Sequence, residues 1–226
     1  KGYNRAELYS GKALDFDGTN DTLSTDYAPS SNIQTTAYWV KIDSLSANQT
    51  LGGFVNGTTD HYGLYYWGGN SNKYFGFNTW NSDSYGIKLP DFVDDWFHIV
   101  AEYNFSDFTK GRIWVNGQEL SISQTLGTTL QRTTASRTFK IDTPSATQEM
   151  NGKINGVKVF EGSLTAAQVA DLYNNPEKIV PTGVADSALK LWLPMQEGAG
   201  TTAYDGSGNG NHGTISGATW THGIGA

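Results

Sequence analysis

Tyrosine and tryptophan side chains gather between residues 62 and 85, with asparagines interspersed among them. An exposed aromatic ring can pack on the apolar C–H face of a sugar, while neighbouring amides bond the sugar hydroxyl groups. Successive residues of a strand point to opposite faces, so alternation separates an outward set from a core set. The predicted carbohydrate-binding set is Tyr65, Trp67, Tyr74, Asn78 and Trp80. The competing interpretation places these rings in the core, because a register error of one residue exchanges the two faces.

Two turns rich in oxygen-bearing side chains are candidates for a calcium site. Asp205 and Asn209 belong to the segment DGSGNGN, and Asp17 and Asp21 flank an early Asp-Gly turn. Calcium takes several oxygen ligands from carboxylates and amides, which a glycine-rich loop can gather. The glutamate that closes an EF-hand loop is missing, and Asp, Asn and Gly also favour turns for their backbone preferences alone. Calcium binding and a plain pair of turns are therefore alternative interpretations.

Residues suited to acid–base chemistry are present, but their spacing assembles no catalytic motif. His98 and Glu102 share one side of a predicted strand, and a structural histidine is the competing interpretation. A lyase acting on a uronate needs a Tyr or His base and side chains that neutralise the carboxylate. The residues that could supply these parts are His61, Tyr62, Tyr65, Lys73, Asn78, His98 and Arg112. A hydrolase needs two carboxylates across a groove, and the usual alternating acidic string does not occur.

Composition excludes several functional classes. The chain of 226 residues has no cysteine, which rules out disulfides, thiolate metal sites and cysteine nucleophiles. Its net charge is −7 and it has no run of lysine or arginine, so nucleic acid is not an expected partner. Its apolar runs are far too short to span a bilayer, so no membrane insertion is expected.

The elements that would position these residues are mostly strands. Segments rich in β-branched and aromatic residues predict strands at 35–42, 63–67, 73–80, 96–105, 111–120, 137–142 and 151–160. One short helix is predicted near 165–174, with Thr165 as its cap, Gln168 closing a capping box and Pro176 ending the run. A connector is predicted over 177–188. Many strands with a single helix predict an all-β fold, namely an antiparallel β-sandwich.

Five segments occur in an order and spacing typical of one fold family. They are ALDFDGTND (13–21), AYWVK (37–41), DWFHIVAEYN (95–104), GRIWVNGQ (111–118) and NGKINGVKVFEGSLTAAQVADLYNNP (151–176). Together they resemble the laminin-G-like family of the concanavalin A-like lectin and glucanase superfamily. The resemblance implies a two-sheet jelly roll that binds glycans at bacterial, viral or extracellular surfaces. In related glucanases an acidic residue helps to hold calcium at the position matching Asn155, where this chain has an amide.

The closing stretch, residues 189–220, resembles the first strands of the same family, although here it follows the last ones. A separate half-sandwich of about forty residues would bury too little apolar surface to be ordered. We therefore predict a single domain over residues 1–226, in which 189–220 supply strands to the same sandwich and Leu191, Leu193 and Ile215 face its core. The alternative is a domain over 1–176 followed by a truncated second copy at 189–226.

The sequence thus predicts a carbohydrate-binding module of a secreted or phage-surface protein, located outside the cell or on a virion surface. Its expected partner is a polysaccharide or a cell-surface glycan. Glucanases and polysaccharide lyases share the fold, so the first alternative is a polysaccharide-degrading enzyme. A lyase acting by β-elimination on uronate glycans such as alginate fits better than a hydrolase. The second alternative is a structural adhesion module whose aromatic residues lie between subunits.

Overall fold

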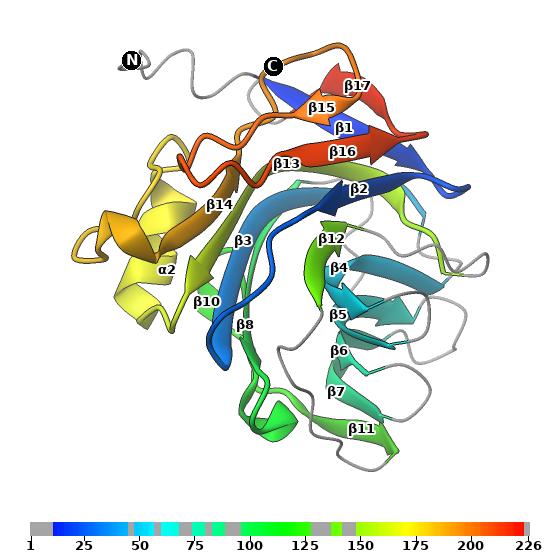
Figure 1. The fold of residues 1–226 in the computed structure, drawn as a ribbon. Helices are drawn as coiled ribbons and strands as arrows, with labels where there is room; N and C mark the ends of the chain where they lie inside the picture. The colour runs from blue at the N-terminus through cyan, green and yellow to red at the C-terminus, as the bar shows by residue number, and fades with distance from the viewer. Residues whose placement is uncertain are drawn as a thin grey trace.

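Two antiparallel sheets pack face to face in the computed structural model (Figure 1). The structure describes residues 11–44, 48–56, 60–67, 74–79, 83–88, 96–127, 137–141 and 148–223. Its helices are α2 (Ala166–Asn174) and the 3₁₀ helices η1 (Phe108–Lys110) and η2 (Asp186–Ala188). None of these described helices has the length and apolar character needed to cross a membrane. The predicted all-β sandwich with one short α-helix is confirmed.

The strands form an eight-stranded sheet and a nine-stranded sheet among the described residues. The order in the first is β10 (Gln118–Glu119), β9 (Arg112–Val115), β8 (Phe97–Asn104), β3 (Ile33–Ile42), β13 (Asn151–Glu161), β1 (Lys12–Asp17) and β17 (Thr219–His222), with β14 (Leu189–Leu193) also paired to β13. The order in the second is β11 (Ser123–Gly127), β7 (Asp83–Lys88), β6 (Tyr74–Asn78), β5 (Asp60–Trp67), β4 (Asn48–Asn56), β12 (Thr138–Ile141), β2 (Thr22–Thr25), β16 (Gly213–Ser216) and β15 (Thr202–Ala203).

An aromatic core fills the space between the sheets. Strand alternation operates as predicted on β5 and β6, whose core side chains include Leu64, Tyr66, Phe75 and Phe77. Phe54 lies edge-on to Tyr103, with 5.1 Å between ring centroids, and Tyr62 lies edge-on to the same ring at 4.9 Å. Each such pair contributes about 1 kcal/mol beyond the burial of its area. The core therefore holds one face of each sheet inward and leaves the alternate residues on the outer faces.

Helix α2 covers part of the outer face of the eight-stranded sheet (Figure 1). Its N-terminus is the predicted capping box, in which the Thr165 hydroxyl accepts from the Gln168 backbone N–H at 3.3 Å. In return, the Gln168 side chain accepts from the Thr165 N–H at 2.9 Å. Val169 and Leu172 then pack with Trp114 of β9 in a second apolar cluster, separate from the main core.

Residues 189–222 contribute β14 to β17 to both sheets. In the eight-stranded sheet β14 pairs with β13, and β17 pairs with β1 (Figure 1). In the other sheet β16 pairs with β2. Leu191, Leu193 and Ile215 lie in the core between the sheets. Residues 189–222 therefore pair with strands from the first part of the chain within the same two sheets.

Candidate functional site

The outer face of β4 to β7 carries most of the predicted binding residues. Trp67 of β5 lies directly opposite Tyr74 of β6. One row further along, Tyr65 lies opposite Gly76, and in the next row Gly63 lies opposite Asn78. The register therefore gathers four of the five predicted residues on one face. The fifth, Trp80, lies outside the described residues.

A strip without side chains runs beside these rings. Gly53 pairs with Gly63, and one row away Gly76 pairs with Gly86. We call these four residues the glycine strip. A Cβ atom at Gly53 or Gly86 would collide with the backbone of the neighbouring strand, so strand packing itself requires glycine at both positions. All four glycines are buried, so the strip serves the close packing of the strands beneath Tyr65 and Asn78.

The aromatic side chains on this face differ in exposure. Trp67, Tyr74 and Asn78 are half-buried, whereas Tyr65 is only 2% exposed. The Tyr65 and Trp67 rings lie 4.5 Å apart between centroids at an angle of 62°. Burial raises the pKa of Tyr65, and a hydrogen bond between its hydroxyl and the Asn48 side chain opposes that rise. Tyr65 therefore packs edge-on against the Trp67 ring, and Trp67 and Tyr74 are the more accessible aromatic side chains among the described residues of this face.

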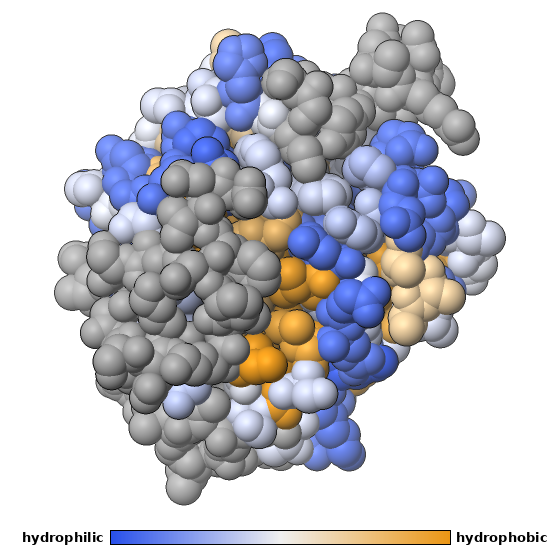
Figure 2. Space-filling view, turned by 180° about the vertical axis from the view of Figure 1, so that it is seen from behind, coloured by the Kyte–Doolittle hydropathy of each residue, from blue (hydrophilic) through white to orange (hydrophobic). Residues whose placement is uncertain are grey.

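The described surface is otherwise largely polar. Seen from behind, apolar side chains gather in a strip near the centre, with hydrophilic side chains along its right flank (Figure 2). Tyr204 is the one large hydrophobic residue that is exposed in the described part of the chain, with 58% of its surface accessible. Tyr204 packs against His212 with 5.4 Å between ring centroids and lies on the tail, away from β5 and β6 in the chain.

The residues considered for a lyase are distributed over different faces. Tyr62 is buried in the main core, where its hydroxyl accepts from the Asn104 backbone N–H at 3.3 Å. Arg112 of β9 belongs to the other sheet and makes a two-pronged ion pair with Glu119, at 2.9 and 2.8 Å. Lys73 and the side chain of His61 lie outside the described residues. The structure does not bring Tyr62, Arg112 and Tyr65 to one place.

His98 is a buried structural histidine. It lies on the outer face of the eight-stranded sheet, beneath Trp39 at 5.1 Å and Tyr173 of α2 at 6.2 Å between ring centroids. Burial, and to a lesser extent the nearby Lys158 ammonium, lowers the pKa of His98 to about 3. The imidazole is therefore neutral at pH 7 and enclosed by aromatic rings, which makes it unsuited to exchange a proton with a substrate.

Backbone groups of β14 and of the turn itself hold the oxygen-rich side chains of the late turn. Both carboxylate oxygens of Asp205 accept N–H groups, from Trp192 and Ser207 on one oxygen and from Asn211 on the other, all at 2.9 Å. Asn209 donates its amide to the Leu189 carbonyl at 3.0 Å. These contacts are those of a turn held by its Asp and Asn side chains.

The early and late turns lie at opposite ends of a strand pair. Asp21 leads into Thr22, which is opposite Ser216, whereas the late turn leads into Gly213, which is opposite Thr25. Three residue steps separate these ends, about 10 Å along the strand. Asp21 instead accepts the Asp17 N–H at 2.7 Å, and Asn155 donates to the Lys12 carbonyl. The structure therefore does not bring the predicted ligands together, and its described residues include no cluster of three acidic or histidine side chains suited to a metal.

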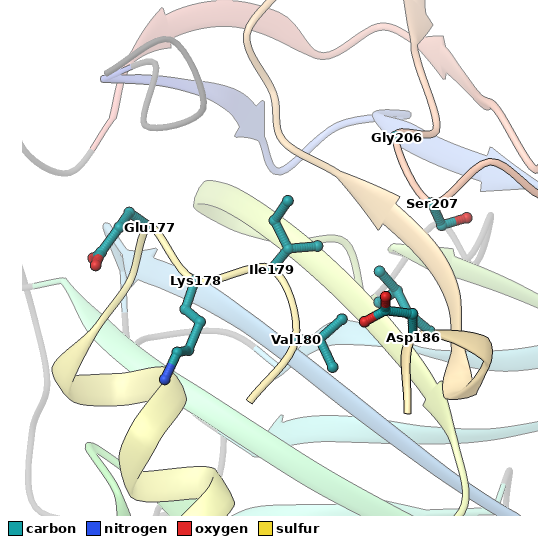
Figure 3. A pocket seen from close by; sticks show the side chains of 8 residues that line it. Glu177, Lys178, Ile179, Val180, Asp186, Gly206 and Ser207 are labelled. Carbon is teal, nitrogen blue, oxygen red and sulfur yellow. The ribbon is translucent and has the colours of Figure 1, made fainter. Parts of the chain in front are cut away.

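A cavity that sequence reasoning missed lies between the segment after α2 and the late turn (Figure 3). Its volume is about 470 Å³, and its lining includes Ile179, Val180, Asp186 and Leu189. The sequence predicts only a connector over 177–188. The apolar pair Ile179 and Val180 within this polar segment could have indicated the cavity. Two adjacent apolar residues in a connector indicate that the segment packs on the domain or lines a binding site.

The family is decided by a match to a family model over residues 17–170, more than half of the chain. That model describes the concanavalin A-like lectin/glucanases superfamily, laminin-G type. The chain belongs to this family. This confirms the resemblance found in the five sequence segments. A comparison with curated proteins found no match to the sequence of this family member.

Solved structures with the same fold share little sequence with this member of the superfamily. A candidate carbohydrate binding protein from Bacteroides ovatus has a TM-score of 0.64 and 18% identity, covering 94% of this chain and 60% of its own. The SAP-like pentraxin of Limulus polyphemus has a TM-score of 0.65 and 12% identity, covering 96% and 97%. Domain 4 of the extracellular GH43 arabinanase AbnA of Geobacillus stearothermophilus, solved with arabinotriose, has a TM-score of 0.52 and 20% identity, covering 71% and 76%. The chain spans 60% of the length of the Bacteroides protein.

Proposed function

We propose that the chain is a carbohydrate-binding module that holds a polysaccharide against the outer face of β5 and β6. The observation that carries this proposal is the register that sets Trp67 opposite Tyr74. Residues opposite each other on neighbouring antiparallel strands have Cβ atoms about 5 Å apart, so the two side chains are direct neighbours on this face. Both side chains are half-buried, which leaves part of each ring accessible to a ligand.

Recognition combines ring stacking with amide hydrogen bonds. The C–H face of a sugar packs on Trp67 or Tyr74, and Asn78 offers both a donor and an acceptor to the hydroxyl groups. Tyr65 holds the Trp67 ring in place through its contact at 4.5 Å, so less conformational entropy is lost when a sugar binds.

The names of two structural neighbours support a glycan ligand. One is named as a candidate carbohydrate binding protein, and the other is an arabinanase domain solved with arabinotriose. Because their sequence identity to this chain is low, they support the class of ligand and do not name the sugar. A location outside the cell or on a virion surface is part of the same proposal, since polysaccharides are met there.

The test is binding to a panel of polysaccharides, including alginate, pectin and arabinan, by affinity gel electrophoresis and calorimetry. We expect Trp67→Ala and Tyr74→Ala each to weaken binding by about tenfold or more, as removal of an aromatic hot spot does. Tyr204→Ala is the matched control, because it removes an exposed ring of the same chain that lies on the tail. This control should bind like the natural chain.

Each contrary result identifies a different alternative. Binding that survives both ring substitutions would contradict the proposed face. An ultraviolet-absorbing unsaturated product accumulating with a uronate polysaccharide would make the chain a lyase. A stable dimer that binds no glycan would favour the structural adhesion module.

Calcium binding by Asp17, Asp21, Asn155, Asp205 and Asn209 stays a separate prediction. The backbone contacts of Asp205 hold the late turn without an added ligand. Thermal unfolding measured with calcium and with a chelator tests the prediction. A higher Tm with calcium supports a bound ion, and an unchanged Tm supports plain turns.

A further inference from the structure

The cavity beside α2 has the size and the lining of a small-molecule site. Its volume of about 470 Å³ lies in the range typical of ligand pockets. Ile179, Val180 and Leu189 provide apolar walls, and Glu177 and Asp186 provide carboxylates at the rim. The close-up shows the Asp186 carboxylate directed toward Val180 (Figure 3). The cavity is separate from the β5–β6 face, since its residues all follow position 176 and lie over the other sheet.

One wall of the cavity is held by an ion-pair network. Lys178 donates from Nζ to both oxygens of Asp171, at 2.8 and 2.7 Å, and to the Thr182 hydroxyl at 2.9 Å. The Thr182 backbone N–H donates to the same carboxylate at 2.8 Å. These bonds attach the segment 178–182 to α2 and occupy the three protons of the Lys178 ammonium. Lys178 therefore lines the cavity with its carbon stem, and its charge is directed away from Asp186 (Figure 3).

The opposite wall is held by the late turn. Asp205 accepts the N–H groups of Trp192 and Ser207, which fixes the turn against β14. A Cβ atom at Gly206 would lie 2.6 Å from the Trp192 ring, so only glycine allows this close approach. The Ser207 hydroxyl accepts from the Asn209 amide at 2.9 Å. Both walls are thus set by the protein before any ligand arrives.

The carboxylates give the cavity a negative charge. Glu177 acts on the buried Lys158 by electrostatic attraction, without a hydrogen bond or ion pair between them in the described part of the chain. Asp186 is exposed, and its side chain makes no hydrogen bond or ion pair with the described part of the chain. Because the Lys178 ammonium is bonded to Asp171, the charge available to a ligand in the cavity is the negative charge of Asp186, with Glu177 adding to it.

We propose that this cavity binds a small primary ammonium. The ammonium donates charge-assisted hydrogen bonds to the Asp186 carboxylate, and the carbon skeleton of the ligand packs on Ile179, Val180 and Leu189. A positive ligand also matches the net charge of −7 of the chain. The site does not use Trp67 or Tyr74, so it stands whether or not the β5–β6 face binds polysaccharide.

The experiment titrates the full chain with glucosamine and with butylamine, and follows the backbone N–H signals of Val180, Asp186 and Ser207 by NMR. Glucose and N-acetylglucosamine are the neutral probes of matching skeleton. We expect the two amines to shift these signals with an affinity at least about tenfold above the neutral sugars, and the difference to shrink as salt rises. Tighter binding of glucosamine than of butylamine assigns the ammonium to an amino sugar, and the reverse order assigns it to an aliphatic amine.

The variant Asp186→Asn tests the central contact, and the fold should tolerate it because the carboxylate is exposed and has no partner among the described residues. We expect it to lose the preference for amines. Asp26→Asn is the matched control, since it removes one exposed carboxylate elsewhere and changes the net charge equally. Equal binding of amines and neutral sugars, no signal shift with any amine, or an unchanged preference in Asp186→Asn would each overturn the proposal. Trp67→Ala should leave amine binding unchanged, which separates this site from the β5–β6 face.

Discussion

The outer faces of the two sheets carry similar aromatic and polar alternation but reach different environments. On the eight-stranded sheet, α2 covers Trp114 and His98, and Lys158 is also buried on this face. On the nine-stranded sheet, Trp67 and Tyr74 stay half-buried, with part of each ring open to a ligand. Strand alternation therefore determines on which face of the sheet a side chain lies. Whether that side chain is buried or accessible to a ligand depends on the element that packs over the face.

The largest contrast is expected between two tryptophans. Trp114→Ala should lower the free energy of unfolding by about 3–5 kcal/mol, because the ring is fully buried and its removal leaves a cavity. Trp67→Ala should lower it by about 1 kcal/mol or less, since that ring is half-buried. Chemical denaturation measures both values. Equal losses would mean that the two outer faces are covered alike.

The stability of the protein should depend on pH because His98 is buried beneath α2 on the outer face of the eight-stranded sheet. Its pKa is lowered from the ordinary 6.5 to about 3 in the fold. Between these values the unfolded chain binds the proton and the folded chain does not, so stability is complete above pH 6.5 and is lost as the pH falls toward 3. The loss should reach a few kcal/mol, since a tenfold change in proton affinity corresponds to about 1.4 kcal/mol. In His98→Gln, the free energy of unfolding should depend less on pH over this range, and an unaltered profile would contradict the burial of His98.

Lys158 should destabilise the protein at neutral pH. Burial lowers its pKa from 10.5 to about 8, against a smaller opposing effect of Glu177. Below pH 8 Lys158 is charged in both the folded and the unfolded chain, so the full cost of burying the charge lowers the stability of the fold. Between pH 8 and 10.5 the folded chain releases this proton before the unfolded chain does, and the cost declines as the pH rises. Lys158→Met should therefore raise stability by about 1–3 kcal/mol at pH 7, with a smaller gain at pH 10. A lower Tm for this variant at pH 7 would show that the attraction to Glu177 outweighs the cost of burying the Lys158 charge.

The smallest effect is expected at the helix cap. Thr165→Ala removes the hydroxyl that accepts the Gln168 N–H and should cost about 1 kcal/mol of stability. Because α2 covers only the eight-stranded sheet, hydrogen exchange should accelerate in α2 and leave β5 and β6 unchanged. Thr165→Ser, which keeps the cap, is the control. Faster exchange across both sheets would mean that the two faces are not independent.

Features that depend on local order could be predicted from the amino-acid sequence. Strand alternation predicted that Trp67 lies on the face opposite the core set, and its neighbours Leu64 and Tyr66 do lie in the core, because the period of two is a property of the strand alone. The capping box at Thr165 was readable for the same reason, since its two partners are three residues apart. The order of five short segments was enough to indicate the family.

Features that depend on contacts distant in the chain became visible only in the folded molecule. The pairing of Trp67 with Tyr74 follows from strand register, and the burial of His98 follows from Tyr173 of α2 lying above it. The role of Asp205 follows from the N–H groups that reach its carboxylate from β14 and from its own turn. The cavity at Asp186 arises where the segment after α2 meets the late turn. No local sequence pattern predicts these contacts, because each depends on strand register, on how the two sheets pack and on which loop or helix lies over their outer faces.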